Sequence, residues 1–357
     1  MKFYDMLQAD CAVLKRKIAA SRTGAGKLYY WAGRAARAVL IVAFAIVFIS
    51  LLSGAFGADN TPMAVVLFCM VLSLRFVNFA YCIGDSLVTL AAALAILVLA
   101  PWAAAAAPPL LVFPLHFAAF FALLFITTLR PEMGNGGLYS FAYIYLTGNP
   151  AVGEALGRRA LMAVAGYLLC AVILVVKHRH QHKTVRFGQF VRAFTLTDPA
   201  HLWQLRMALG VAVAVTAGQL LGVERFIWVG FACSSLLSVY PYSPDTSERF
   251  RQRIAGVVAG SAAFFLLYTV TPESFHSLMG PLGGVCLGFC TDYRYKTAMN
   301  CLGALMLAAG TYGLSGAVVL RVFDTLAGAV FGLVFVAVFH RLVGVRFLPR
   351  QGEPDRP

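Results

Sequence analysis

The chain has 357 residues, of which 60% are hydrophobic and 12% are charged, and its mean hydropathy is +0.78. Soluble globular domains carry about 25% charged residues, so this composition excludes that class and indicates a polytopic protein embedded in a lipid bilayer. The net charge of +14 does not predict a nucleic-acid partner, because the basic residues lie between apolar runs and form no basic domain with a core of its own.

The first 36 residues show no secretory signal pattern, because the first long apolar run starts only near Ala38 and no cleavage site follows it. Apolar side chains recur at helical spacing from Phe3 to Ile18, and three basic residues occupy positions 15–17. We therefore expect a cytoplasmic amphipathic helix that either lies on an anionic leaflet or packs on the rest of the protein.

Twelve apolar runs follow, in two sets of six. Several are shorter than the ~20 residues that a straight helical crossing needs, so we expect tilted, broken or re-entrant segments among them. The runs lie at about 38–56, 61–74, 86–102, 109–129, 137–149 and 159–176, and again at 206–222, 226–240, 253–271, 277–291, 296–313 and 319–340. The predicted fold is an all-α polytopic membrane protein of two six-helix repeats, related by a parallel pseudo-two-fold axis along the membrane normal.

This pattern predicts five segments along the chain. They are a basic N-terminal segment (1–36), a first six-helix repeat (37–176), a basic cytoplasmic linker (177–205), a second six-helix repeat (206–340) and a cytoplasmic tail (341–357). In this arrangement all but four of the 29 Lys and Arg residues face the cytoplasm, the exceptions being Arg158, Arg159, Arg225 and Arg321. By the positive-inside rule, both termini are expected in the cytoplasm.

The two halves also share spaced residues at a shift of 162 positions. Arg159, Gly166 and the His178-Arg179 pair align with Arg321, Gly328 and the His340-Arg341 pair. Each half then has one arginine near the outer start of its last helix, one glycine inside that helix and one His-Arg pair at its inner exit. Internal repeats of this kind are typical of transporters that bind substrate between their halves.

A charged elbow at 240–260 joins two apolar runs of the second half. Two prolines end the first run, and Ser247 with Glu248 begins the next helix. Arg249 and Arg253 lie one turn apart on that helix, and Gly256 and Gly260 continue the same face. The arginines are candidate substrate-binding residues at the cytoplasmic mouth, or topology anchors of the kind found beside any span.

Three further charged residues are site candidates. Arg321 and Asp324 lie three positions apart, so they share a helix face, either as a structural ion pair or as an anion-binding arginine beside a proton-coupling aspartate. Arg159 is the matching substrate-binding candidate of the first half. Asp85 opens the third apolar run, either as a helix cap or as a second proton-coupling site.

The remaining motifs indicate packing and not catalysis. Glycines at four-residue spacing predict close helix crossings at Gly256, Gly260, Gly284, Gly288 and Gly328. The eight cysteines contain no CxxC pair, and His116 stands alone in its run, so we predict no metal site and no cofactor. With no catalytic triad, paired-carboxylate motif or metal-ligand spacing, the sequence does not favour an enzyme.

The second half carries the residues of a recognisable signature. Arg249-x3-Arg253-x2-Gly256-x3-Gly260 and the later Arg321-x2-Asp324-Thr325-x2-Gly328 resemble the motifs of the fusaric-acid-resistance-like, or aromatic acid exporter, family of bacterial inner-membrane proteins. In the first half, Cys82 and Ile83 stand where that family has arginine, and Met162 stands opposite Asp324.

The resemblance implies export of aromatic or other organic acids across the bacterial inner membrane, beside a periplasmic adaptor protein. A homo-oligomer is a further candidate assembly. The favoured hypothesis is a proton-coupled organic-anion exporter with its path between the two repeats. A passive organic-anion channel and a membrane scaffold are the alternatives, and a channel would need the same arginines but no titrating acid.

Overall fold

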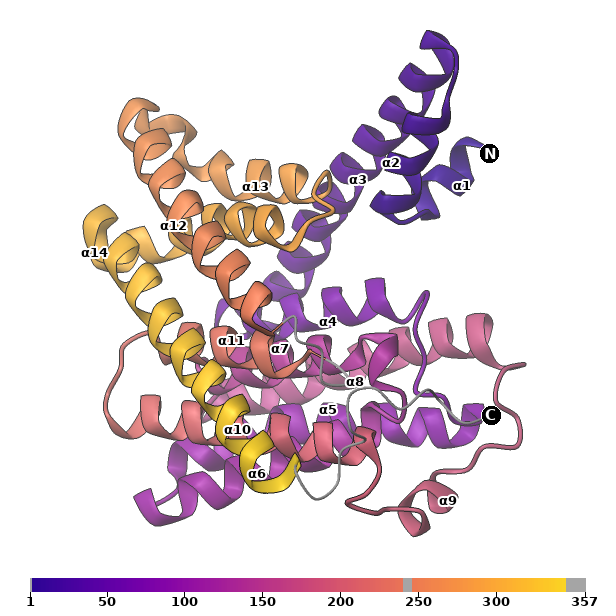
Figure 1. Ribbon diagram of the computed structural model, residues 1–357, viewed down its shortest axis with the longest axis vertical. Helices are drawn as coiled ribbons and strands as arrows, with labels where there is room; N and C mark the ends of the chain where they lie inside the picture. Colours follow the sequence, from indigo (N-terminus) through magenta and orange to yellow (C-terminus); the bar gives the residue numbers. More distant parts are fainter. Residues whose placement is uncertain (1, 240–245, 345–357) are drawn as a thin grey trace. The chain divides into compact units, whose positions relative to one another are not determined.

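The computed structural model describes residues 2–239 and 246–344, and in these ranges it is built of helices, fourteen of them α-helices (Figure 1). Seven are long and apolar enough to cross a membrane. These are α3 (Gly24–Phe56), α5 (Ile83–Ala106), α6 (Pro109–Thr127), α8 (Glu154–His178), α10 (Pro199–Leu220), α12 (Thr246–Val270) and α14 (Tyr293–Phe339). The protein is thus a multi-pass membrane protein with seven candidate spans.

The other helices are shorter than a straight crossing requires. They are α1 (Phe3–Gln8), α2 (Cys11–Ala20), α4 (Thr61–Ser73), α7 (Asn135–Thr147), α9 (Phe187–Arg192), α11 (Phe226–Leu237) and α13 (Met279–Leu287). The short predicted runs at 61–74, 137–149 and 277–291 correspond to α4, α7 and α13. The last two predicted runs both lie in α14, whose two helical segments meet at a kink at Gly313 (φ 70°, ψ 169°), a backbone conformation that glycine adopts without a Cβ clash.

The chain forms two compact units. Unit 1 contains residues 1–48 and 248–326, and unit 2 contains 49–247 and 327–357, so α3 and α14 contribute to both. The units are defined by the contacts within them, and their bounds differ from those of the two predicted repeats. The division into two repeats therefore stays a prediction. The elbow residues 240–245 and most of the predicted tail lie outside the described residues.

In unit 1 the N-terminal segment forms two short helices, α1 and α2, of which α1 packs on α3. Asp10 begins α2, its carboxylate accepting a hydrogen bond from the Ala12 N–H at 2.7 Å. Met6 and Leu14 are fully buried, and the Met6 side chain lies against Gly33 of α3. The segment therefore packs on the protein, which is the second of the two arrangements expected from the sequence.

Close helix crossings also organise the rest of unit 1. A Cβ atom added to Gly256 of α12 would lie 2.5 Å from the Arg294 carbonyl oxygen of α14, and one added to Gly260 would lie 2.5 Å from that of Ala298. On α13, Gly284 faces Val42 and Gly288 faces Ala38, both of α3. Without side chains at these positions, the backbones approach more closely than larger residues would allow.

Unit 2 is built around α10, which packs on α6 and α11. Most of α10 is buried, and its hydropathy is the lowest of the seven candidate spans. A helix enclosed by other helices can carry polar groups that lipid would exclude. Gln204 is fully buried on α10 and donates a hydrogen bond to the Thr128 carbonyl at 3.0 Å.

Two sets of contacts in unit 2 resemble each other. On α8, Gly166 faces Leu67 of α4, and on α14, Gly328 faces Val229 of α11. At the end of α8, His178 Nε2 donates to the Leu74 carbonyl at 2.8 Å, just past the end of α4. At the end of α14, His340 Nε2 accepts a hydrogen bond from Arg206 at 3.0 Å, and Arg206 donates to the carbonyl oxygen of Leu237, the last residue of α11.

Candidate functional site

Two arginines and a tyrosine form the centre of the candidate site, near the start of α12 in unit 1. Arg249 and Arg253 lie one turn apart on α12. The guanidinium of Arg253 donates a hydrogen bond to the Tyr293 hydroxyl at 2.7 Å, and the guanidinium carbon of Arg249 lies 3.9 Å from the centre of the Tyr293 ring. Tyr293, the first residue of α14, thus contacts both cations.

The charge of these arginines is not neutralised by a carboxylate among residues 2–239 and 246–344. Neither forms an ion pair there, and the Nε atoms of both are buried without a hydrogen-bond partner in the same ranges. Arg251, between them in sequence, differs: it pairs with Glu248 at 2.7 Å and its side chain is 72% exposed. Arg253 is only 9% exposed, so its charge lies in a largely desolvated position.

A second group of charged residues lies on α14. Arg321 and Asp324 are 6% and 1% exposed, and they lie about two turns beyond Gly313, deeper in the helix than the sequence suggested. Arg321 interacts electrostatically with Arg253 and Asp324, and its side chain lies within hydrogen-bonding reach of Cys301. The structure thus brings together three of the predicted residues from two helices.

Tyr293 is the member of this site that the sequence did not single out. It follows the turn at Thr291-Asp292 and opens a stretch of alternating aromatic and basic residues, Tyr293-Arg294-Tyr295-Lys296. Such a stretch is typical of a membrane interface, so it gave no specific signal. The pairing with α12 depends on the contact between Gly256 and Arg294, which only the fold reveals.

Arg159 lies apart from this group, in unit 2, where it holds three segments together. It donates hydrogen bonds to the Asn60 side chain at 3.0 Å and to the carbonyl oxygens of Asn149 at 2.8 Å and Asp59 at 3.1 Å. At 1% exposure, its N–H groups are used by neutral acceptors of the protein itself. A structural role accounts for these contacts.

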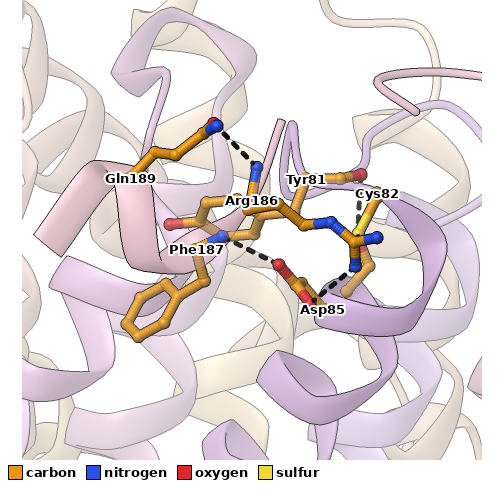
Figure 2. Close-up of polar contacts among 7 residues, drawn as sticks. Tyr81, Cys82, Asp85, Arg186, Phe187 and Gln189 are labelled. Carbon is orange, nitrogen blue, oxygen red and sulfur yellow. Dashed lines mark hydrogen bonds and ion pairs between the residues drawn. The ribbon is translucent and has the colours of Figure 1, made fainter. Parts of the chain in front are cut away.

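Asp85 also lies in unit 2, in the first turn of α5 (Figure 2). Its carboxylate accepts a hydrogen bond from the Phe187 N–H at 2.8 Å and lies 3.7 Å from the Arg186 guanidinium, so it binds the start of linker helix α9. Arg186 also donates to Cys82 Sγ at 3.3 Å. Burial raises the pKa of the neighbouring Tyr81 hydroxyl, and the negative charge of Asp85 raises it further.

His116 has partners that its isolation in the sequence did not suggest. It is fully buried, with Nδ1 2.8 Å from the Tyr143 hydroxyl and Nε2 3.0 Å from the Gln219 side-chain oxygen. These contacts join α6, α7 and α10. Among the described residues, no group of three His, Cys, Asp or Glu side chains is arranged to hold a metal ion.

Comparison with known protein families finds a match over the range that contains the arginine site. Residues 207–335 match the family model for fusaric acid resistance protein-like proteins. The resemblance drawn from the signature residues is confirmed for this range, which contains Arg253, Arg321 and Asp324 and leaves out Asp85 and Arg159. A fusaric acid resistance protein-like region in a multi-pass membrane protein implies a role in transport or efflux. No curated protein and no solved structure matches the chain.

Proposed function

We propose that the protein is a bacterial inner-membrane transporter that exports aromatic or other organic carboxylates and is driven by the proton gradient. The observation that carries this proposal is the charge of Arg253, which is 9% exposed and has no carboxylate partner among the described residues. A buried cation is costly in a membrane protein, and a carboxylate substrate would offset that cost through charge-assisted hydrogen bonds.

The proposed path starts at Arg249 and Arg253 and continues to Arg321. The first two would bind the carboxylate at the cytoplasmic mouth, and Arg321 would receive it deeper in the protein. Asp324, on the same helix face as Arg321, would take up a proton, which removes its negative charge and leaves Arg321 to the anion. Arg253 and Arg321 lie close enough for their like charges to repel each other, and this proximity supports this order of transfer.

We further propose that the chain contains two six-helix repeats. The matching positions of Gly166 and Gly328, and of His178 and His340, support a duplicated packing of the sixth helix of each half on the second. We place the path between the halves, with both termini in the cytoplasm as the positive-inside rule requires. The periplasmic adaptor and the homo-oligomer remain predictions.

The decisive variant is Arg253→Gln, which keeps a polar side chain but shortens it and removes its charge. We expect it to abolish uptake of labelled benzoate into inside-out proteoliposomes while the protein inserts and purifies normally. Arg251→Gln is the matched control, because Arg251 lies on the same helix but is exposed and paired with Glu248. Normal uptake by Arg253→Gln would make this arginine a topology anchor.

A further inference from the structure

The contacts of Tyr293 resemble those expected of a bound aromatic acid. Its ring lies on the guanidinium of Arg249 at 3.9 Å, and its hydroxyl oxygen accepts a hydrogen bond from Arg253 at 2.7 Å. An aromatic carboxylate would present the same two features, a ring face for one arginine and an oxygen acceptor for the other. The phenol and such a ligand cannot use the same N–H of Arg253 at once.

The two acceptors differ in strength. A neutral phenol oxygen offers Arg253 a single hydrogen bond without a countercharge, whereas a carboxylate offers a full negative charge and two oxygen atoms. The phenol is also tethered to the protein, so it competes at a high effective concentration without any cost of association. Its presence therefore lowers the apparent affinity for a carboxylate, and displacing it costs about one hydrogen bond.

We propose that Tyr293 is a built-in competitor for the anion site, and that its hydroxyl lowers the affinity for the substrate by occupying one of the Arg253 N–H groups that a carboxylate would otherwise bind. This rests on the proposed function, since it assumes that Arg253 binds the exported anion. A weakened inner site favours a transporter, because a substrate held too tightly at the mouth would not move on towards Arg321. Tyr293 is in this sense an affinity-determining residue.

The test is the dissociation constant of benzoate for the purified full-length protein, measured by isothermal titration calorimetry. Tyr293→Phe keeps the ring on Arg249 and removes only the hydroxyl, so we expect benzoate to bind about fivefold more tightly, the change expected for one hydrogen bond that no longer has to be broken. Tyr295→Phe is the matched control. Its hydroxyl accepts a hydrogen bond from Arg294 at 2.9 Å, but Tyr295 is 49% exposed, and we expect no change in affinity.

Arg253→Gln separates the failure of this inference from that of the proposed function. If Arg253→Gln binds benzoate as well as the wild type does, the anion site itself is wrong. If Arg253→Gln loses binding but Tyr293→Phe binds benzoate equally or more weakly, the site stands and the competitor role of Tyr293 is overturned.

A second measurement keeps the phenol hydroxyl at position 293 and follows it directly. With 3-fluorotyrosine incorporated at position 293 alone, we expect its fluorine resonance to shift as benzoate saturates the protein. The same label at position 295 should not shift. A resonance at 293 that is unaffected by saturating benzoate would show that the phenol stays on Arg253, contrary to the proposal.

Discussion

Arginine side chains lie at the starts of both α5 and α12, but their partners differ. At α12 the arginines belong to the helix itself, and the partner of Arg253 is the neutral hydroxyl of Tyr293. At α5 the arginine comes from the linker, where Arg186 lies 3.3 Å from Cys82 Sγ and 3.7 Å from Asp85 (Figure 2). A carboxylate thus neutralises the charge of Arg186 at α5. At α12, the charges of Arg249 and Arg253 have no carboxylate partner among the described residues.

This difference has a functional consequence. Arg186 reaches the start of α5 from the linker and donates a hydrogen bond to Cys82, 104 residues away. Because Asp85 holds that guanidinium and also accepts the Phe187 N–H, the start of α5 serves to attach the linker. Under the proposed function, the anion is therefore expected to bind at α12 and not at α5.

The largest expected effect comes from Asp324→Asn, which removes the proposed proton acceptor on α14, near the arginines of α12. We expect the variant to lose accumulation of benzoate against its gradient but to keep exchange of labelled for unlabelled benzoate. Both are measured in proteoliposomes with and without an imposed proton gradient. Asp292→Asn, an exposed aspartate of the same unit, is the control. Gradient-driven accumulation in Asp324→Asn would mean that this residue does not couple transport to protons.

A smaller effect is expected from Gly256→Ala, which tests whether the arginine site depends on the close crossing of α12 and α14. The new Cβ would lie 2.5 Å from the Arg294 carbonyl oxygen, so the helices must separate, at a cost of about 1–3 kcal/mol. We expect a lower Tm in detergent and weaker benzoate binding.

Gly310→Ala is the control for this substitution. Gly310 lies on α14 and has no atom within 4 Å of its added Cβ position, so its Tm should stay the same or rise slightly. Equal changes in Tm in the two variants would show that the close crossing of α12 and α14 at Gly256 does not stabilise the protein.

The smallest effect is expected from Asp85→Asn, because this substitution breaks an ion pair whose Arg186 side chain is 62% exposed. Exposed pairs contribute less than about 1 kcal/mol, so the free energy of unfolding should change little. Benzoate uptake should be unchanged, since the anion site lies at α12. A loss of proton-driven uptake in Asp85→Asn would instead assign proton coupling to the first half.

Much of the fold follows from hydropathy alone, since each of the twelve apolar runs lies largely in a helix. The bounds were less predictable: α3 begins at Gly24, well before the apolar run, and its early part packs on α1 through the contact between Gly33 and Met6. The last two runs stay two helical segments, which meet at the Gly313 kink within α14. Neither feature has a hydropathy signal.

The site was predictable only in part, because sequence spacing shows which residues share a helix face but not which residues of other helices they contact. The spacing of Arg249 and Arg253, or of Arg321 and Asp324, is a property of one helix and can be read from sequence. The partners of these residues come from other helices. Tyr293 meets Arg253 across 40 positions, and Arg186 meets Asp85 across 101, contacts that no local pattern encodes.

The most direct test of the α12 anion site is an experimental structure of the protein with 4-bromobenzoate, whose bromine atom marks the ligand in the map. The account predicts the carboxylate within hydrogen-bonding distance of Arg253, the ring against Arg249, and the Tyr293 hydroxyl displaced from its present contact. A ligand bound elsewhere in the protein, with the hydrogen bond between Arg253 and Tyr293 intact, would contradict it.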